Sequence, residues 1–129
     1  MGQTVRTLAT TGPLDPATCW QRYYELDQWA GWSPQVAGVE AAGTVLSLGL
    51  SGSVVVTGGL RVPFVVPSVD IEHRRWSWIA RPLGITLSLT HTVEAHPKGT
   101  RATLAVEGPA AVVTAYAPLA YVALRRLVS

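Results

Sequence analysis

Residues 85–94 read ITLSLTHTVE. The odd-numbered positions carry aliphatic residues and one histidine, His91, whereas the even-numbered positions carry Thr, Ser or Glu. Because successive side chains of a β-strand point to opposite faces, this period of two predicts a strand with one buried face. A turn at Pro97-Lys98-Gly99 then joins it to a second alternating segment at 102–106. The pattern predicts a hairpin with one face on the core.

Weaker strand signals come before this hairpin. They are found at residues 3–9, 46–50, 54–66, 69–73 and 76–79. The segment 54–66 is rich in valine but is broken by Gly58-Gly59, Pro63 and Pro67, which favours bulges or edge positions there. Together with the hairpin, these segments predict a sheet of six to seven strands.

Helical signals flank the strands on both sides. Asp15 followed by Pro16 is typical of a helix start, and apolar residues recur at helical spacing as far as Leu26. A short helical turn follows, in which Trp29 and Trp32 share one face. Residues 109–128 predict a long terminal helix whose first four turns carry no charge, so most of its surface must contact apolar groups.

Composition limits the class of protein. The chain has 129 residues, 48% of them hydrophobic and 14% charged, which predicts a single globular domain over 1–129. Its net charge of +2 is too small for an electrostatic nucleic-acid binder. The single cysteine, Cys19, excludes an internal disulfide and a cysteine-based zinc cluster. No binding of nucleic acid is expected.

Two uncharged runs were weighed as membrane spans. Residues 41–60 have the glycine, serine and threonine content of strands and turns. Residues 108–124 are more apolar, but they number 17 and contain Pro118, whereas a span needs about 20 residues. The N-terminus lacks the layout of a signal peptide. We therefore expect no integral membrane span and a cytoplasmic protein.

Short motifs occur along the chain in a distinctive order. They are Trp20, then Asp27, Trp29, Trp32 and Pro34, the turn at Gly43, the Trp76–Trp78 strand, His91, Gly99-Thr100-Arg101, and Glu107-Gly108-Pro109. Together they resemble the SRPBCC superfamily of START-like proteins, which includes polyketide cyclases and lipid-transfer proteins. The resemblance covers nearly the whole chain. It implies an α+β helix-grip fold, in which a curved antiparallel sheet wraps around the C-terminal helix and leaves an apolar cavity.

The resemblance implies a hydrophobic small-molecule ligand, polyketide-like or lipid-like, and leaves three functions open. The first is a polyketide cyclase or dehydratase that works by general acid–base chemistry without a cofactor. The second is a non-catalytic carrier or sensor of an apolar metabolite. The third is an interaction module that forms a homodimer through the charge-free terminal helix. The chain contains no phosphate-binding loop, dinucleotide fingerprint or zinc-protease helix, and we expect no cofactor.

His91 is the leading candidate for catalysis. It shares a strand face with aliphatic residues, and a neutral imidazole facing the cavity would serve as a general base. The alternative is a hydrogen-bonded structural histidine of the core. Arg81 and Tyr116 are the candidate donors to an enolate or carbonyl, although arginines on such strands more often extend to water. The expected ligand-binding residues are Trp76, Trp78, Leu89, Arg61, Phe64, Val112 and Leu48.

A metal site is not predicted. His91 and His96 are five residues apart, which on one strand places them on opposite faces of the sheet. Cys19 has no histidine near it in the sequence and is expected to be a buried structural residue.

Overall fold

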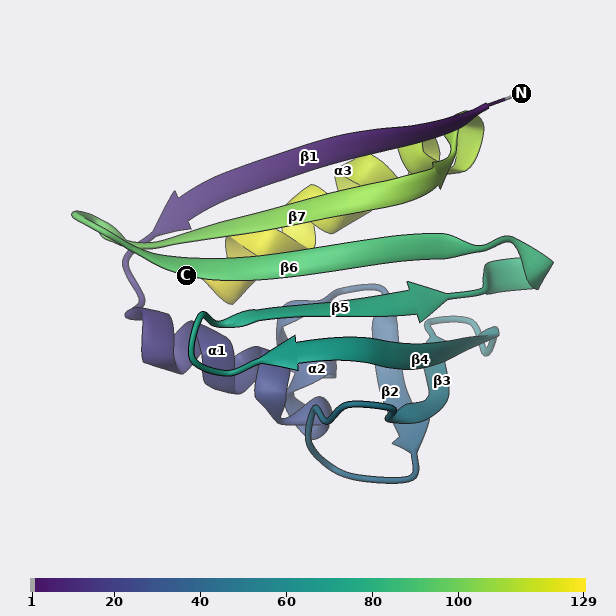
Figure 1. The fold of residues 1–129 in the computed structure, drawn as a ribbon, viewed down its shortest axis with the longest axis horizontal. Helices are drawn as coiled ribbons and strands as arrows, with labels where there is room; N and C mark the ends of the chain where they lie inside the picture. Colours follow the sequence, from purple (N-terminus) through teal and green to yellow (C-terminus); the bar gives the residue numbers. More distant parts are fainter. Residues whose placement is uncertain (1) are drawn as a thin grey trace.

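The computed structural model describes residues 2–129 and contains one seven-stranded antiparallel sheet (Figure 1). The strands lie in the order β1-β7-β6-β5-β4-β3-β2. Their bounds are β1 Gln3–Gly12, β2 Val36–Ala41, β3 Ser51–Val56, β4 Arg61–Asp70, β5 Arg75–Ala80, β6 Leu87–His96 and β7 Gly99–Pro109. The helices are α1 Pro16–Tyr24, α2 Trp29–Trp32 and α3 Ala110–Leu127, with 3-10 turns η1 Leu26–Gln28 and η2 Pro82–Gly84.

The sheet curves around α3, as Figure 1 shows, and α3 packs on β1 and β7. The predicted α+β architecture and its number of strands are therefore confirmed. The predicted hairpin of β6 and β7 is present, with His96 paired to Gly99 across a two-residue turn. Leu87, Leu89, His91 and Val93 are all buried on the concave face, as the alternation predicted.

The helix starts follow their local chemistry. Asp15 accepts a hydrogen bond from the backbone N–H of Thr18 at 3.2 Å, and Pro16 occupies the first turn of α1. At the other end of the chain, α3 continues through Pro118 to Leu127. Nη1 of Arg22 donates to the carbonyl oxygens of Arg126 and Leu127, at 2.9 and 3.0 Å. A side chain of α1 thereby forms hydrogen bonds with carbonyl groups in the last turn of α3, which accept no bond from a following turn of the helix.

The prediction of a strand over 46–50 was wrong. Leu46 and Leu50 are buried, but they flank a turn in which the N–H of Leu50 donates to the carbonyl of Ser47. Leu48 lies at the tip of this turn and is 75% exposed. The alternation of leucines therefore reflects a turn anchored at both ends, and β3 begins only at Ser51.

Two further boundaries differ from the prediction. Gly58 and Gly59 do not form a bulge but the turn between β3 and β4, where both adopt positive φ angles that favour glycine. At Pro67, in contrast, the predicted bulge is present: the register of β4 shifts between Val65 and Ser68, where Pro67 has no N–H to donate. The strand predicted over 69–73 ends at Asp70, because residues 71–74 turn the chain into β5.

Candidate ligand-binding cavity

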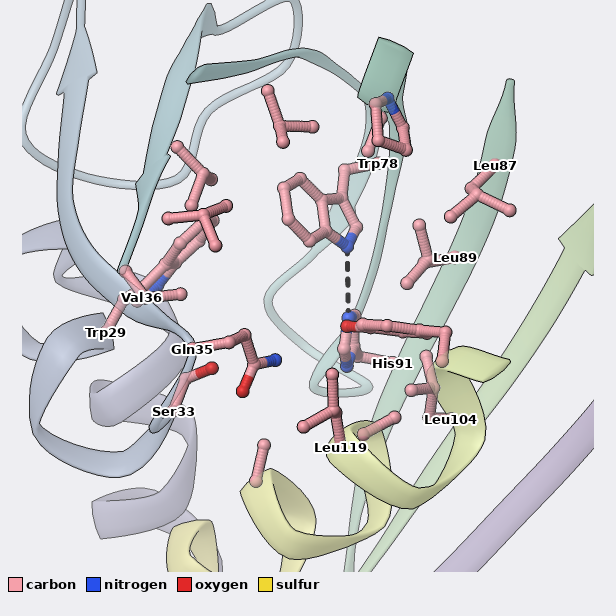
Figure 2. Close-up of a pocket in the computed structure, with 18 of the residues that line it drawn as sticks. Trp29, Ser33, Gln35, Val36, Trp78, Leu87, Leu89, His91, Leu104 and Leu119 are labelled. Carbon is pink, nitrogen blue, oxygen red and sulfur yellow. Dashed lines mark hydrogen bonds between the residues drawn. The ribbon is translucent and has the colours of Figure 1, made fainter. Parts of the chain in front are cut away.

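A cavity of about 230 Å³ lies between the concave face of the sheet and α3 (Figure 2). Its walls come from α2, β3, β4, β5, β6, β7 and α3. The lining is almost entirely aliphatic and aromatic. Within residues 2–129, no Asp, Glu, Lys or Arg side chain belongs to this lining. The cavity is therefore suited to an uncharged apolar molecule.

The cavity opens beside the turn that joins β3 and β4. Leu60 in this turn is 43% exposed, and Leu119 on α3 is 48% exposed. Both leucines also line the cavity, so each has one side toward solvent and another toward the interior. This pair, together with Pro82, marks an apolar mouth.

One wall of the cavity is a cluster of aromatic rings. Trp76 and Trp78 share a face of β5, and Trp29 of α2 packs against both, with ring centroids 5.5 and 5.4 Å away. The indole N–H of Trp29 donates to the carbonyl of Tyr23 at 2.8 Å. The tilted and edge-on contacts among these rings fix a rigid wall before any ligand enters.

His91 lies on this wall with both ring nitrogens in hydrogen-bonding contact. The indole N–H of Trp78 donates to Nε2 of His91 at 3.2 Å, the dashed line in Figure 2. Because an indole nitrogen can only donate, Nε2 must be the acceptor and the ring proton must lie on Nδ1. Nδ1 faces the hydroxyl of Tyr23 at 3.1 Å, and the ring of Trp76 stacks on the imidazole.

The electrostatics of this site keep His91 neutral. Burial lowers the pKa of His91 from its ordinary 6.5 to about 3, because the charged imidazolium would lose its hydration. Protonation would also place an N–H on Nε2 facing the N–H of Trp78. A general base near neutral pH needs a free lone pair and a higher pKa. The geometry therefore favours the structural alternative for His91 over the catalytic one.

Three other polar side chains belong to the lining: Ser33, Gln35 and Tyr116. Tyr116 projects from α3, where burial raises the pKa of its phenol and the nearby side chain of Gln35 opposes that shift. The carboxamide of Gln35 points into the cavity in Figure 2. Its oxygen, Oε1, is buried and has no hydrogen-bond partner. Gln35 therefore has unused hydrogen-bonding capacity inside an apolar space.

Gln35 was not among the residues predicted from the sequence. It follows Pro34 in a short connection between α2 and β2, where no periodicity indicates the direction of a side chain. The one feature of the sequence that could have pointed to Gln35 is a single amide side chain between apolar segments. This feature is also common in exposed loops.

The structure brings half of the predicted site residues together. Those that line the cavity are His91, Tyr116, Trp76, Trp78 and Leu89. The other five lie outside the lining. Phe64 is buried behind it, in contact with Trp29 and Trp78, and Val112 packs on the core at a turn of α3 away from the cavity. Leu48 points to solvent from its turn.

The two arginines lie at strand ends on the surface. Arg61 begins β4 and forms an ion pair with Glu40 on β2. Arg81 follows β5 directly, is exposed, and lies at the start of η2. Their positions at the strand ends allow each guanidinium to remain hydrated, which explains why neither lines the apolar cavity.

The described residues form neither a metal site nor a membrane-spanning helix. In the part of the chain that the structure describes, no three His, Cys, Asp or Glu side chains come close enough to hold a metal ion. Cys19 is fully buried beside the end of α3, with its thiol near the carbonyl of Leu127. No helix between residues 2 and 129 has the length and apolar character needed to cross a bilayer.

Comparison with known proteins identifies the fold. No family model and no curated protein matches the chain. Among solved structures, Ara h 8.0201 superposes with a TM-score of 0.77 at 13% identity, covering 98% of this chain and 95% of that one. The hypothetical protein jhp0584 from Helicobacter pylori gives a TM-score of 0.78 at 14% identity, covering 98% of this chain and 86% of that one.

These likenesses establish the architecture of the chain. It has the helix-grip fold of these structures, and the fold that the sequence predicted is confirmed. Because these structures are only 13% and 14% identical in sequence, they do not define a ligand or an activity for this chain.

Proposed function

We propose that this protein binds an uncharged hydrophobic small molecule in the cavity between its sheet and α3, as a carrier or sensor. The observation that carries the proposal is a cavity of about 230 Å³ with no charged side chain in its described lining. A space of this kind stays poorly hydrated and favours apolar occupants. The exposed leucines at its mouth provide an entry path.

The size of the cavity sets the scale of affinity. A ligand that buries roughly 200 Å² of apolar surface gains about 5 kcal/mol at ~25 cal/mol per Å². This corresponds to a dissociation constant on the order of 0.1–1 mM before any polar contact is added. Because the aromatic side chains of the wall are already held in place, binding a ligand costs little side-chain entropy.

Catalysis of the polyketide-cyclase type is the second candidate. The observation in its favour is that the lining holds two neutral donors, the hydroxyl of Tyr116 and the amide nitrogen of Gln35, which would stabilise the oxygen of an enolate. A general base is the component that the cavity lacks, since both nitrogens of His91 are engaged. Binding without turnover is therefore the stronger proposal.

Methyl NMR with naphthalene as the probe tests the binding proposal. We expect naphthalene to shift the methyl resonances of lining residues such as Val62, Leu89 and Leu104. Ala120→Phe fills the cavity from α3 and should abolish these shifts, whereas Ala115→Phe on the exposed face of the same helix should leave them intact.

A second variant guards against misfolding of Ala120→Phe. Leu119→Trp changes a half-exposed residue at the mouth and should slow exchange of the probe while the fold is retained. Mass spectrometry under native conditions first establishes whether the purified protein retains a ligand. Absence of methyl shifts at saturating naphthalene in ligand-free protein would refute the proposed function.

A further inference from the structure

We infer that the natural ligand is a neutral, flat molecule of about two fused rings whose single hydroxyl, carbonyl or N–H group is held by the carboxamide of Gln35. This inference rests on the proposed function, because it specifies which hydrophobic molecules the same cavity accepts. It is argued from the volume, charge, shape and hydrogen-bonding capacity of the cavity.

The volume limits the ligand to a compact molecule. An engineered apolar cavity of about 150 Å³ accepts benzene, and drug-sized ligands occupy pockets of about 300–1,000 Å³. At about 230 Å³, the cavity lies between these cases and fits roughly two fused rings. A long acyl chain or an extended polyketide would need more space than this volume provides.

The lining excludes an ionised ligand. In the described chain, the nearby guanidinium groups of Arg61 and Arg81 lie outside the cavity, and Arg61 is already paired with Glu40. A buried carboxylate or ammonium group would therefore have no opposite charge, and its lost hydration would cost several kcal/mol. Only a neutral polar group can accompany the rings.

The shape of the wall favours a flat ligand. Trp29, Trp76 and Trp78 line one side of the cavity with their rings fixed against one another. A planar ring system gains offset or edge contacts with these indoles in addition to simple burial. A branched aliphatic ligand of equal volume lacks that gain.

Gln35 supplies the polar anchor. On the aromatic wall, His91 is already bonded to Trp78 and Tyr23, and the indole N–H of Trp76 is a buried donor without a partner in the described chain. Gln35 supplies the matching acceptor elsewhere in the lining. Oε1 of Gln35 has no partner, and a buried oxygen left unpaired destabilises a protein by about 1–3 kcal/mol. Rotation about the terminal torsion of glutamine is broad, so the carboxamide can present either its oxygen or its nitrogen to a ligand.

Three probes with one ring system separate these features. They are 2-naphthol, naphthalene and 2-naphthoate, titrated by methyl NMR at neutral pH. We expect 2-naphthol to bind about tenfold more tightly than naphthalene, and 2-naphthoate at least tenfold more weakly than naphthalene. Dodecanol serves as a long neutral alcohol and should not shift the methyl resonances of the lining.

Substitution of Gln35 tests the anchor directly. Gln35→Leu should weaken the binding of 2-naphthol about tenfold and leave the affinity for naphthalene unchanged. Gln35→Met, with a side chain of similar length, should have the same effect. Gln3→Leu, at an exposed position of β1, is the matched control and should change neither affinity. A thermal melt of each variant verifies that the fold is retained.

Each result has a distinct meaning. Equal affinities for 2-naphthol and naphthalene that no Gln35 variant alters would overturn the anchor, although the cavity would still bind apolar molecules. Tight binding of dodecanol would overturn the compact character of the ligand without affecting the proposed function. Tight binding of 2-naphthoate would overturn the neutral character of the ligand, in the inference and in the proposed function alike. If none of the neutral probes shifts the methyl resonances, the proposed function itself fails.

Discussion

Trp78 and His91 are joined across the β5–β6 pair by a hydrogen bond from Nε1 of the indole to Nε2 of the imidazole, 3.2 Å long. The two residues are diagonal neighbours, since Trp78 pairs with Leu89 and His91 pairs with Trp76. This register lets one tryptophan stack on the imidazole while the other donates to it. The histidine that the sequence singled out is therefore held in one tautomer by its neighbouring strand.

The tautomer of His91 is the first testable consequence. Because Nε2 accepts from Trp78, we expect the neutral ring to carry its proton on Nδ1 at pH 7. Two-dimensional NMR correlating ring nitrogens with ring protons distinguishes the two tautomers. Trp78→Phe removes the donor and should raise the pKa of His91, since Nε2 is then free to accept a proton. Observation of a protonated Nε2 in the unmodified protein would contradict the assignment.

The second prediction concerns stability in acid. Burial lowers the pKa of His91 to about 3 in the folded protein, whereas an exposed histidine in the unfolded chain has an ordinary pKa of 6.5. As the pH falls below 6.5, only the unfolded state takes up this proton, so the free energy of unfolding decreases by about 1.4 kcal/mol per pH unit. Between pH 6.5 and pH 5, the protonation of His91 in the unfolded chain should therefore reduce the free energy of unfolding by about 2 kcal/mol.

Urea unfolding at pH 7 and at pH 5 measures this contribution. His91→Gln should abolish most of the pH dependence in this window, even if it destabilises the protein at both values. His96→Gln, near the exposed turn between β6 and β7, is the matched control and should retain the dependence. An unchanged slope in His91→Gln would show that other groups cause the loss of stability.

The contact between Arg22 and the end of α3 gives the third prediction. Its guanidinium donates to the carbonyls of Arg126 and Leu127, and so links α1 to the helix that closes the cavity. Arg22→Met should lower the free energy of unfolding by about 1–2 kcal/mol. It should also speed amide exchange in the last turn of α3. Arg6→Met, at an exposed position on β1, should leave both quantities unchanged.

Gly12 gives the fourth prediction, because the chain approaches itself closely there. A methyl group at this position would overlap the carbonyl of Val128, at the end of α3. Gly12→Ala should therefore destabilise the protein by more than about 2 kcal/mol in urea unfolding. Gly31→Ala in α2 meets open space and should be neutral or stabilising by up to about 1 kcal/mol. Similar stabilities for the two variants would contradict the close packing of α3 on β1.

Much of the fold could be predicted from local patterns. Strict alternation over β6 indicated the buried face on which His91 lies, and Asp15-Pro16 marked the start of α1. Such signals are reliable because the direction of a side chain along a strand or helix depends on the backbone period alone. Where the chain turns, the period has no meaning, and the leucines at 46–50 gave a false strand for that reason.

The sequence by itself determined the class of fold, the helix boundaries and the inward direction of His91. Only the tertiary structure decided what His91 can do, since its partners come from β5 and α1, 13 and 68 residues away along the chain. It also decided that Gln35 faces the cavity and that Arg61 and Arg81 do not. Period and composition are local properties, whereas the partners of a buried polar group depend on which distant segments the folded chain brings together.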